Sequence, residues 1–337
     1  MDPQAKTTQQ TQTSSRLAYL DILRGMGTLL VLFGHIYLND AAFRWIYTFH
    51  MPLFFFAAGW TYREKPFWID LKRRVQTILI PYFCFGTLTL GYWLLVERHF
   101  RDTGLDLSTA VYGLFAGQYD YLGFNVPLWF LPCFFVLTVF FNLLVCLGGQ
   151  KLAFGLSALM SLVFLLTPLP SLPWGIDRTF RYIAFFAIGH LLSAHNAGPI
   201  LQQLYTPVKW GAALGLLGCS IFLSFYYTET GIRWFLNGFV GILAALLLAL
   251  LLKKNAVLEY LGRISLIALC VQGPIYRVLA TLVSIPLQTS TDAVRSNFLL
   301  ASLLVLMTLV LCILGYKFLD RFAPWAIGKT AKYRPCH

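Results

Sequence analysis

The segment from residue 17 to residue 37 places three ionisable side chains, Asp21, Arg24 and His35, in an otherwise apolar stretch. Ionisable groups are costly in hydrocarbon, so those found there are functional candidates by default. Arg24 and His35 lie about three helical turns apart, which brings both side chains onto one helix face within roughly 20°. Asp21 and Thr28 fall near the same line. The spacing predicts one polar stripe that faces the inside of a helix bundle.

The two ends of this stripe suit different chemistry. Arg24 and His35 are separated by about 16 Å along a helix axis, so they cannot touch the same atom but can hold two ends of a long ligand. Arg24, oriented by Asp21 one turn earlier, is a fixed cation suited to a phosphate or a carbonyl group. His35, as a neutral imidazole, is suited to act as a general base toward a hydroxyl group.

Other interpretations of the same residues remain open at this point. In a structural one, Asp21 and Arg24 pair to stabilise a helix end and His35 bonds to a neighbouring helix. In a transporter or flippase, Asp21, Arg24 and His35 form a proton or substrate relay. In a noncatalytic sensor or scaffold, His35 has no chemical role.

The composition of the chain predicts the kind of fold that positions these residues. Of the 337 residues, 58% are hydrophobic and only 12% are charged, against about 25% charged in soluble domains. Apolar runs near the roughly 20 residues that span a bilayer recur along the chain. We therefore exclude a soluble enzyme and predict an all-α, polytopic integral membrane bundle of about ten transmembrane helices. The expected spans lie near 17–38, 46–62, 75–96, 127–147, 152–168, 179–195, 208–227, 233–252, 264–284 and 298–318.

The basic residues indicate the topology of this bundle. The chain has 26 Lys and Arg against 14 Asp and Glu, a net charge of +12. With the N-terminus inside, most of these cations fall in the inner connections, as the positive-inside rule requires. The charge therefore predicts a bilayer as partner and no nucleic acid. We expect a disordered cytoplasmic tail at 1–15, a transmembrane domain at 16–320 and a basic cytoplasmic tail at 321–337, in a multi-pass membrane protein.

Two motifs carry a resemblance to a known family. They are LDILRGMGTLLVLFGH at 20–35 and FHMPLFFFAAGW at 49–60. The chain resembles the acyltransferase 3 family, integral membrane enzymes that acylate sugars, and within it the fucose 4-O-acetylase-like branch. Arg24 and His35 match the Arg-x10-His pattern of that family. Weaker matches follow in the family's order at 71–82, 127–135, 180–192 and 258–269.

The resemblance implies a reaction and its substrates. It implies transfer of an acyl group, expected to be acetyl, from acyl-CoA to a sugar hydroxyl of a surface polysaccharide or a lipid-linked glycan. His35 would be the essential catalytic residue, with Arg24 as its partner on the stripe. We further expect the coenzyme A phosphates to meet Lys72, Arg73 and Arg74. An ordinary positive-inside loop is the alternative for these three cations.

Further residues are expected to support the acceptor. His50 is predicted to lie near His35, where it would orient the base, contact the acceptor or cap its helix. Trp129 would stack on a sugar ring or anchor the chain at the membrane interface. Gln272, where the family often has a histidine nearby, would hydrogen-bond an acceptor. The long outer connection at 97–126 is a candidate to shape the acceptor site, with an uninvolved loop as the alternative.

No motif predicts a metal or a permanently bound cofactor. The chain has no HExxH pair, P-loop, GxSxG elbow or glycine-rich dinucleotide turn, so acetyl-CoA is expected as a co-substrate only. The seven cysteines show no CxxC pair, and we interpret them as core residues.

Overall fold

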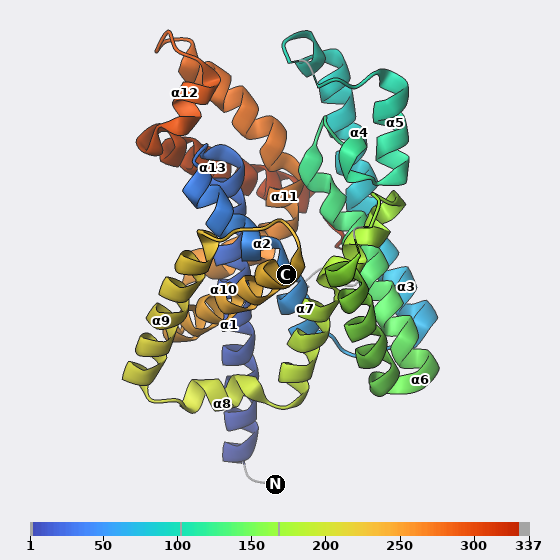
Figure 1. Cartoon of the computed structure of the whole chain (residues 1–337), viewed down its shortest axis with the longest axis vertical. Coiled ribbons are helices and arrows are strands. Elements are labelled where there is room, and N and C mark those ends of the chain that lie inside the picture. The colour runs from blue at the N-terminus through green and yellow to red at the C-terminus, as the bar shows by residue number, and fades with distance from the viewer. Residues whose placement is uncertain (1–2, 102, 168, 330–337) are drawn as a thin grey trace. The chain divides into compact units, whose positions relative to one another are not determined.

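The computed structural model describes residues 3–101, 103–167 and 169–329, and the side chains from residue 18 onward. Every regular element in this part is helical, so the predicted all-α class is confirmed (Figure 1). The α-helices are α1 (Pro3–Ile36), α2 (Asp40–Trp60), α3 (Phe67–Arg74), α4 (Ile80–Leu95), α5 (Leu107–Ala116), α6 (Phe130–Leu166), α7 (Ile176–Ala194), α8 (Ala197–Gln203), α9 (Thr206–Ser224), α10 (Gly231–Leu251), α11 (Ala256–Ser284), α12 (Thr291–Ser296) and α13 (Phe298–Phe322). Short helical turns are η1 (Val75–Leu79), η2 (Glu97–His99), η3 (Tyr119–Tyr121), η4 (Val126–Trp129), η5 (Pro173–Gly175) and η6 (Pro324–Ile327).

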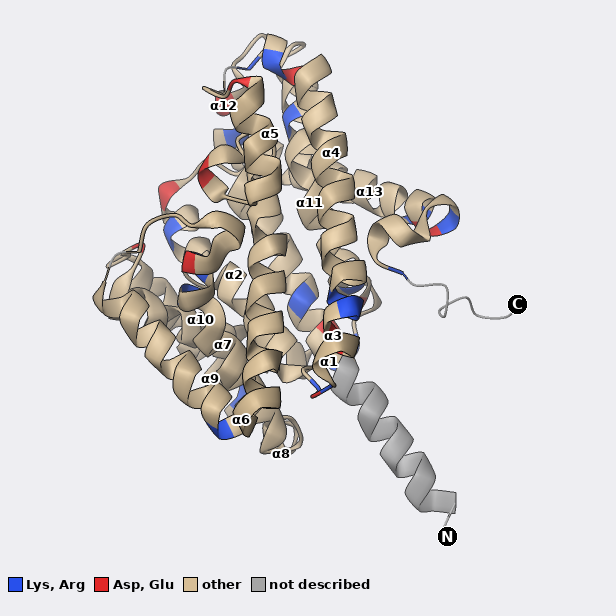
Figure 2. Cartoon of the chain, turned by 90° about the vertical axis from the view of Figure 1, so that its right-hand side faces the viewer, with Lys and Arg blue, Asp and Glu red and all other residues tan. Residues whose placement is uncertain are grey.

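Several of these helices have the length and composition of membrane spans. Figure 2 shows that most of the helical ribbon carries no charged residue. Seven stretches among the described residues are long and apolar enough to cross a bilayer, which supports an integral membrane protein. They are Ala18–Ile36, Phe67–His99, Val126–Leu166, Thr206–Ser224, Gly231–Leu251, Ala256–Ser284 and Phe298–Phe322.

Seven spans differ from the predicted ten at three places. α2 and α7 form where spans were predicted, but neither is among the seven. α6 is a single element of 37 residues where two spans were predicted, and it leaves helical geometry at Gly148 and Gly149. A helix of that length measures about 55 Å, nearly twice the roughly 30 Å of a bilayer core. The break at the two glycines is where such an element would turn to form two spans. The count of ten spans and the cytoplasmic position of both termini stay predictions.

The chain forms two compact units. The first consists of Met1–Tyr62 and Phe185–Ser265, and the second of Arg63–Ala184 and Leu266–His337. In the first unit α10 packs against α1, α2 and α9, and in the second α3 packs against α6 and α4 against α5. The predicted N-terminal tail lies outside the described side chains and the C-terminal one lies largely outside the described residues, so both stay predictions.

Two glycines let α1 and α11 meet backbone to backbone in the first unit. A Cβ atom at Gly25 would collide with the carbonyl oxygen of Leu258, and one at Gly262 would collide with that of Asp21. Small residues at such crossings allow close helix packing inside membranes. The crossing therefore fixes the stretch of α1 that carries Asp21 and Arg24.

This crossing predicts a stability difference between two glycine-to-alanine variants. We expect Gly25→Ala to lower the free energy of unfolding by about 1–3 kcal/mol, because α1 and α11 must separate to admit the methyl group. Gly218→Ala in α9 is the control, since nothing lies near its Cβ position and alanine favours helix. Thermal unfolding in detergent measures both, and equal melting temperatures would contradict the crossing.

Candidate active site

Arg24 lies half-buried on α1 and reaches the last turn of α2. Its Nη1 atom lies 3.2 Å from Oδ1 of Asp21. Its Nη2 atom donates to the hydroxyl oxygen of Thr61 at 3.1 Å and to the carbonyl oxygen of Ala57 at 3.3 Å. The predicted pair of Asp21 and Arg24 is therefore present, and the guanidinium also ties α1 to α2.

The end of α2 is a suitable place for a cation. Thr61 is the C-cap residue of α2, and the last carbonyl groups of a helix lack partners within it and carry the negative end of its dipole. Arg24 thus compensates one carboxylate and one helix end at the same time. Thr28 donates its hydroxyl to the carbonyl oxygen of Arg24 at 2.9 Å, so this part of the predicted stripe is bound to its own helix.

His35 lies in the last turn of α1, next to the start of α2. The connection between the two helices is short, as α1 ends at Ile36 and α2 begins at Asp40. Tyr47 of α2 contacts both histidines of the predicted site. Its ring centroid lies 6.1 Å from that of His35 and 4.7 Å from that of His50, in edge-to-face arrangements.

Tyr47 was not singled out from the sequence, although one signal was available. Tyr47 and His50 are three residues apart, which places them on one helix face. The structure thereby gathers His35, Tyr47 and His50 at the turn between α1 and α2, and His35 is half-buried.

The hydrogen bond of His50 defines which of its nitrogens carries the proton. Its Nδ1 atom lies 2.8 Å from the carbonyl oxygen of Ile46, one turn earlier on α2. A carbonyl group only accepts, so Nδ1 is the donor and, in the neutral ring, Nε2 is the acceptor. The side chain is only 3% exposed. His50 is therefore a fixed, buried imidazole, bonded within its own helix.

Aromatic rings line this turn. Phe43 lies over Tyr47 with a centroid distance of 4.0 Å, and 6.2 Å from the ring of Tyr227 in the connection between α9 and α10. Apolar walls limit the water around a polar group, which strengthens its electrostatic interactions. The imidazole of His35 thus lies at the edge of an aromatic group.

The three predicted donor-binding cations have different surroundings in the second unit. All three belong to the last turn of α3. The Nε atom of Arg74 lies 2.5 Å from Oδ2 of Asp70, a carboxylate only 2% exposed, so its charge is already compensated. Lys72 and Arg73 are exposed and form no ion pair within the described part of the chain. They are the two cations available to an anionic ligand.

Trp129 does not offer an open face for stacking. The ring is 8% exposed, the guanidinium of Arg178 lies 4.6 Å from its centroid, and Tyr182 stacks on it at 5.8 Å. A sugar ring would have to displace one of these neighbours. The predicted stacking role is not tested by these contacts.

Gln272 is fully buried in α11, and neither its amide nitrogen nor its amide oxygen has a hydrogen-bond partner among the described residues. Asn125, also buried, donates to the carbonyl oxygen of Cys270 at 2.7 Å, while its own side-chain oxygen has no hydrogen-bond partner in the part of the chain that the structure describes. Leaving such a group unsatisfied costs about 1–3 kcal/mol. Both amides therefore have hydrogen-bonding capacity for a water molecule or a ligand, and the acceptor contact of Gln272 stays a prediction.

The described residues contain no group of three or more His, Cys, Asp or Glu side chains that could hold a metal ion. The predicted site residues divide between the units. Asp21, Arg24, His35 and His50 lie in the first, and Lys72, Arg73, Arg74, Trp129 and Gln272 lie in the second.

Comparison with known proteins gives one match. The family model described as "Acyltransferase domain" matches residues 17–317, nearly the whole described chain. No curated protein and no solved structure matches the sequence. The match confirms the family predicted from the motifs, whereas the branch within it stays a prediction.

The bridge between α1 and α2 predicts an energetic coupling. We expect Arg24→Gln and Thr61→Val each to lower the free energy of unfolding, and the double variant to lose about 1 kcal/mol less than their sum, because both remove the same hydrogen bond. Thr77→Val is the control, since its hydroxyl donates to the carbonyl oxygen of Arg73 in its own helical segment. Combined with Arg24→Gln, it should give losses that simply add. Strictly additive losses for Arg24 and Thr61 would show that the bridge contributes no stability.

Proposed function

We propose that the chain, which belongs to the acyltransferase domain family and is in general terms a membrane acyltransferase, is an O-acetyltransferase. In this proposal it moves an acetyl group from acetyl-CoA to a sugar hydroxyl. The acceptor is a surface polysaccharide or a lipid-linked glycan, and the enzyme belongs to the fucose 4-O-acetylase-like branch and to the bacterial inner membrane. The observation that carries this proposal is the position of His35 beside Tyr47 and His50 at the turn between α1 and α2.

His35 acts as the general base in this proposal. Its imidazole takes the proton of the acceptor hydroxyl while the hydroxyl oxygen attacks the thioester carbonyl carbon. The new C–O bond forms, the C–S bond breaks, and the proton passes to the leaving sulfur to give free coenzyme A. His35 lies in the last turn of α1, where the negative end of the helix dipole stabilises the imidazolium that forms transiently.

Tyr47 and His50 act as positioning residues. The Tyr47 ring contacts the rings of both His35 and His50. The His50 ring is fixed by its hydrogen bond to the carbonyl oxygen of Ile46. Rigid neighbours keep a catalytic group in productive geometry.

Arg24 and the α3 cations serve the donor. Arg24 lies about 16 Å from His35 along α1, so it acts on a part of acetyl-CoA remote from the thioester, with its guanidinium held in place by Asp21 and Thr61. Lys72 and Arg73 receive the phosphate groups, because they are exposed and phosphates pair well with such cations.

Removal of the base should remove activity without unfolding the chain. A general base contributes about 10²- to 10⁴-fold to a rate, so we expect His35→Ala to reduce release of coenzyme A from acetyl-CoA by that factor while the melting temperature stays near wild type. His195→Ala is the matched control, because His195 is exposed directly after α7 and its side chain bonds to the carbonyl oxygen of Leu191, one turn earlier. Normal turnover in a folded His35→Ala protein would contradict the role of His35 as the general base.

Loss of the α3 cations should affect donor affinity rather than chemistry. For the double variant Lys72→Gln and Arg73→Gln we expect the KM for acetyl-CoA to rise about ten-fold, with kcat nearly unchanged, because the phosphates are bound equally in the ground and transition states. Steady-state kinetics in detergent measure both constants. The double variant Lys253→Gln and Lys254→Gln, at two exposed positions after α10, makes the same change in net charge and is the control. An equal KM in the two double variants would show that α3 does not bind the donor.

A further inference from the structure

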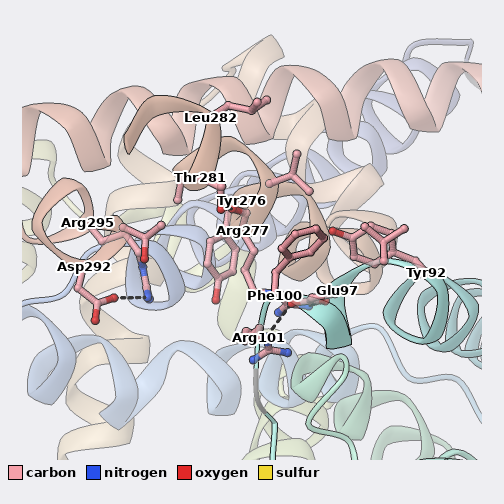
Figure 3. A pocket seen from close by; sticks show the side chains of 14 residues that line it. Tyr92, Glu97, Phe100, Arg101, Tyr276, Arg277, Thr281, Leu282, Asp292 and Arg295 are labelled. Atoms are coloured by element: carbon pink, nitrogen blue, oxygen red, sulfur yellow. Dashed lines mark hydrogen bonds and ion pairs between the residues drawn. The ribbon is translucent and has the colours of Figure 1, made fainter. Parts of the chain in front are cut away.

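The second unit contains a pocket of about 430 Å³ that the proposed reaction does not use. Its walls come from the end of α4, the η2 turn, the second half of α11 and α12 (Figure 3). The lining combines three arginines with two acidic residues, and adds aromatic and aliphatic side chains to both. Such a mixture of a charged end and an apolar wall is typical of a site for an amphiphilic ligand.

A buried carboxylate organises the charged end. Glu97 is 6% exposed, and its Oε1 atom lies 2.7 Å from Nε of Arg101 and 2.5 Å from Nε of Arg277. Its Oε2 atom accepts from Nη2 of Arg277 at 3.0 Å. Glu97 therefore holds two guanidinium groups side by side, and both of its oxygens are engaged. It has little capacity left for a cationic ligand.

The arginines retain hydrogen-bond donors. The Nε atoms of Arg101 and Arg277 form ion pairs with Oε1 of Glu97. The Nη2 atom of Arg277 donates to Glu97 and to the carbonyl oxygen of Phe124, and that of Arg101 donates to the carbonyl oxygen of Gly123. The Nη1 groups of both make no hydrogen bond within the described part of the chain. Each guanidinium has five N–H donors, so both can still bind an anion.

A third arginine lies on the same pocket from the side of α12. Arg295 has its guanidinium carbon 5.4 Å from the Tyr276 ring centroid, and its Nη1 atom lies 3.5 Å from Oδ1 of Asp292. Asp292 is 75% exposed, so this ion pair is weak. With Glu97 compensated by two arginines, the pocket keeps one net positive charge.

The rest of the lining is apolar. The apolar wall includes Phe100, Val96, Val278 and Leu282. These residues belong to α11 or follow α4, and both helices lie in stretches that can span a membrane. Phe100, Leu282 and Val278 are also among the exposed large hydrophobic residues. A hydrocarbon chain can therefore lie against the wall whose polar end the arginines form.

We propose that this pocket binds an anionic phospholipid whose phosphate carries no cationic group, with the phosphate at Arg101, Arg277 and Arg295 and the acyl chain along the apolar wall. Planar guanidinium groups bind phosphate through paired hydrogen bonds. We assign a lipid rather than a water-soluble phosphate compound as the ligand because the wall next to the arginines is apolar. The assignment does not rest on the acyltransfer reaction.

Binding of labelled lipid to the full-length protein tests this assignment. In mixed micelles of phosphatidylcholine and detergent, we expect phosphatidic acid with a fluorescent acyl chain to bind saturably, and phosphatidylcholine with the same label to bind much more weakly. Arg295→Gln should weaken binding of phosphatidic acid about ten-fold, or about 1.4 kcal/mol, because it removes one charged partner of the phosphate. Arg101→Lys keeps a cation beside Glu97 but loses the fork of donors, and it should weaken binding as well if the protein stays folded.

Matched controls separate the possible outcomes. Arg98→Gln makes the same charge change at an exposed position of η2 outside the pocket lining, and it should bind like wild type. His35→Ala should also bind like wild type, so a failed reaction and a failed lipid site are distinguishable. Equal binding by Arg295→Gln and wild type, or by the two lipids, would overturn the proposal. Displacement of the lipid by inorganic phosphate at matched concentration would overturn the lipid assignment in favour of a free phosphate site.

Discussion

A charged arginine in an apolar helix is costly unless oxygen atoms of the protein compensate its charge. The charge of Arg24 is compensated by Asp21 on its own helix and by the carbonyl and hydroxyl oxygens at the end of α2. Because those partners belong to two helices, the charge also sets how α1 lies on α2. The short connection at the other end then brings His35 beside Tyr47 and His50.

Glycine and aromatic packing complete this arrangement in the first unit. Gly25 and Gly262 let α1 and α11 touch at their backbones, next to the Asp21 and Arg24 pair. At the opposite end of α1, the rings of Phe43 and Tyr47 adjoin His35. One helix thus carries a cation held by a carboxylate and the end of α2, and an imidazole that contacts aromatic rings, about 16 Å apart along the helix axis.

The second unit meets the same constraint in another way. Here a buried carboxylate, Glu97, lies between two arginines instead of one arginine lying between a carboxylate and a helix end. Replacing Glu97 would leave those cations close together and uncompensated, which is the costly case for partly buried charges. A network of this kind holds guanidinium groups at a pocket wall with some donors unused.

The sequence predicted features that depend on local spacing. The pair of Asp21 and Arg24, three residues apart, was readable from helix geometry, and the apolar runs predicted the helical class. The pair of Asp70 and Arg74 has the same local character, and it gives Arg74 a carboxylate partner where the basic run predicts a donor site or an ordinary positive-inside loop.

Features that depend on tertiary packing were not accessible in this way. Glu97 and Arg277 are 180 residues apart, so no periodicity links them. The covering of Trp129 by Arg178 and Tyr182 also arises only when the chain folds. By contrast, the break of α6 at Gly148 and Gly149 lies between the two predicted spans at 127–147 and 152–168, where two glycines interrupt the apolar run of the sequence.

The most direct test of the central claim is the fate of a radiolabelled acetyl group in proteoliposomes that contain the purified chain, acetyl-CoA and candidate glycan acceptors. The account predicts that free coenzyme A appears in equal amount with base-labile acetyl ester on an acceptor sugar, and that neither appears with His35→Ala protein. Movement of an acceptor across the bilayer without loss of acetyl-CoA would contradict it, and would make the polar residues of α1 a transport path.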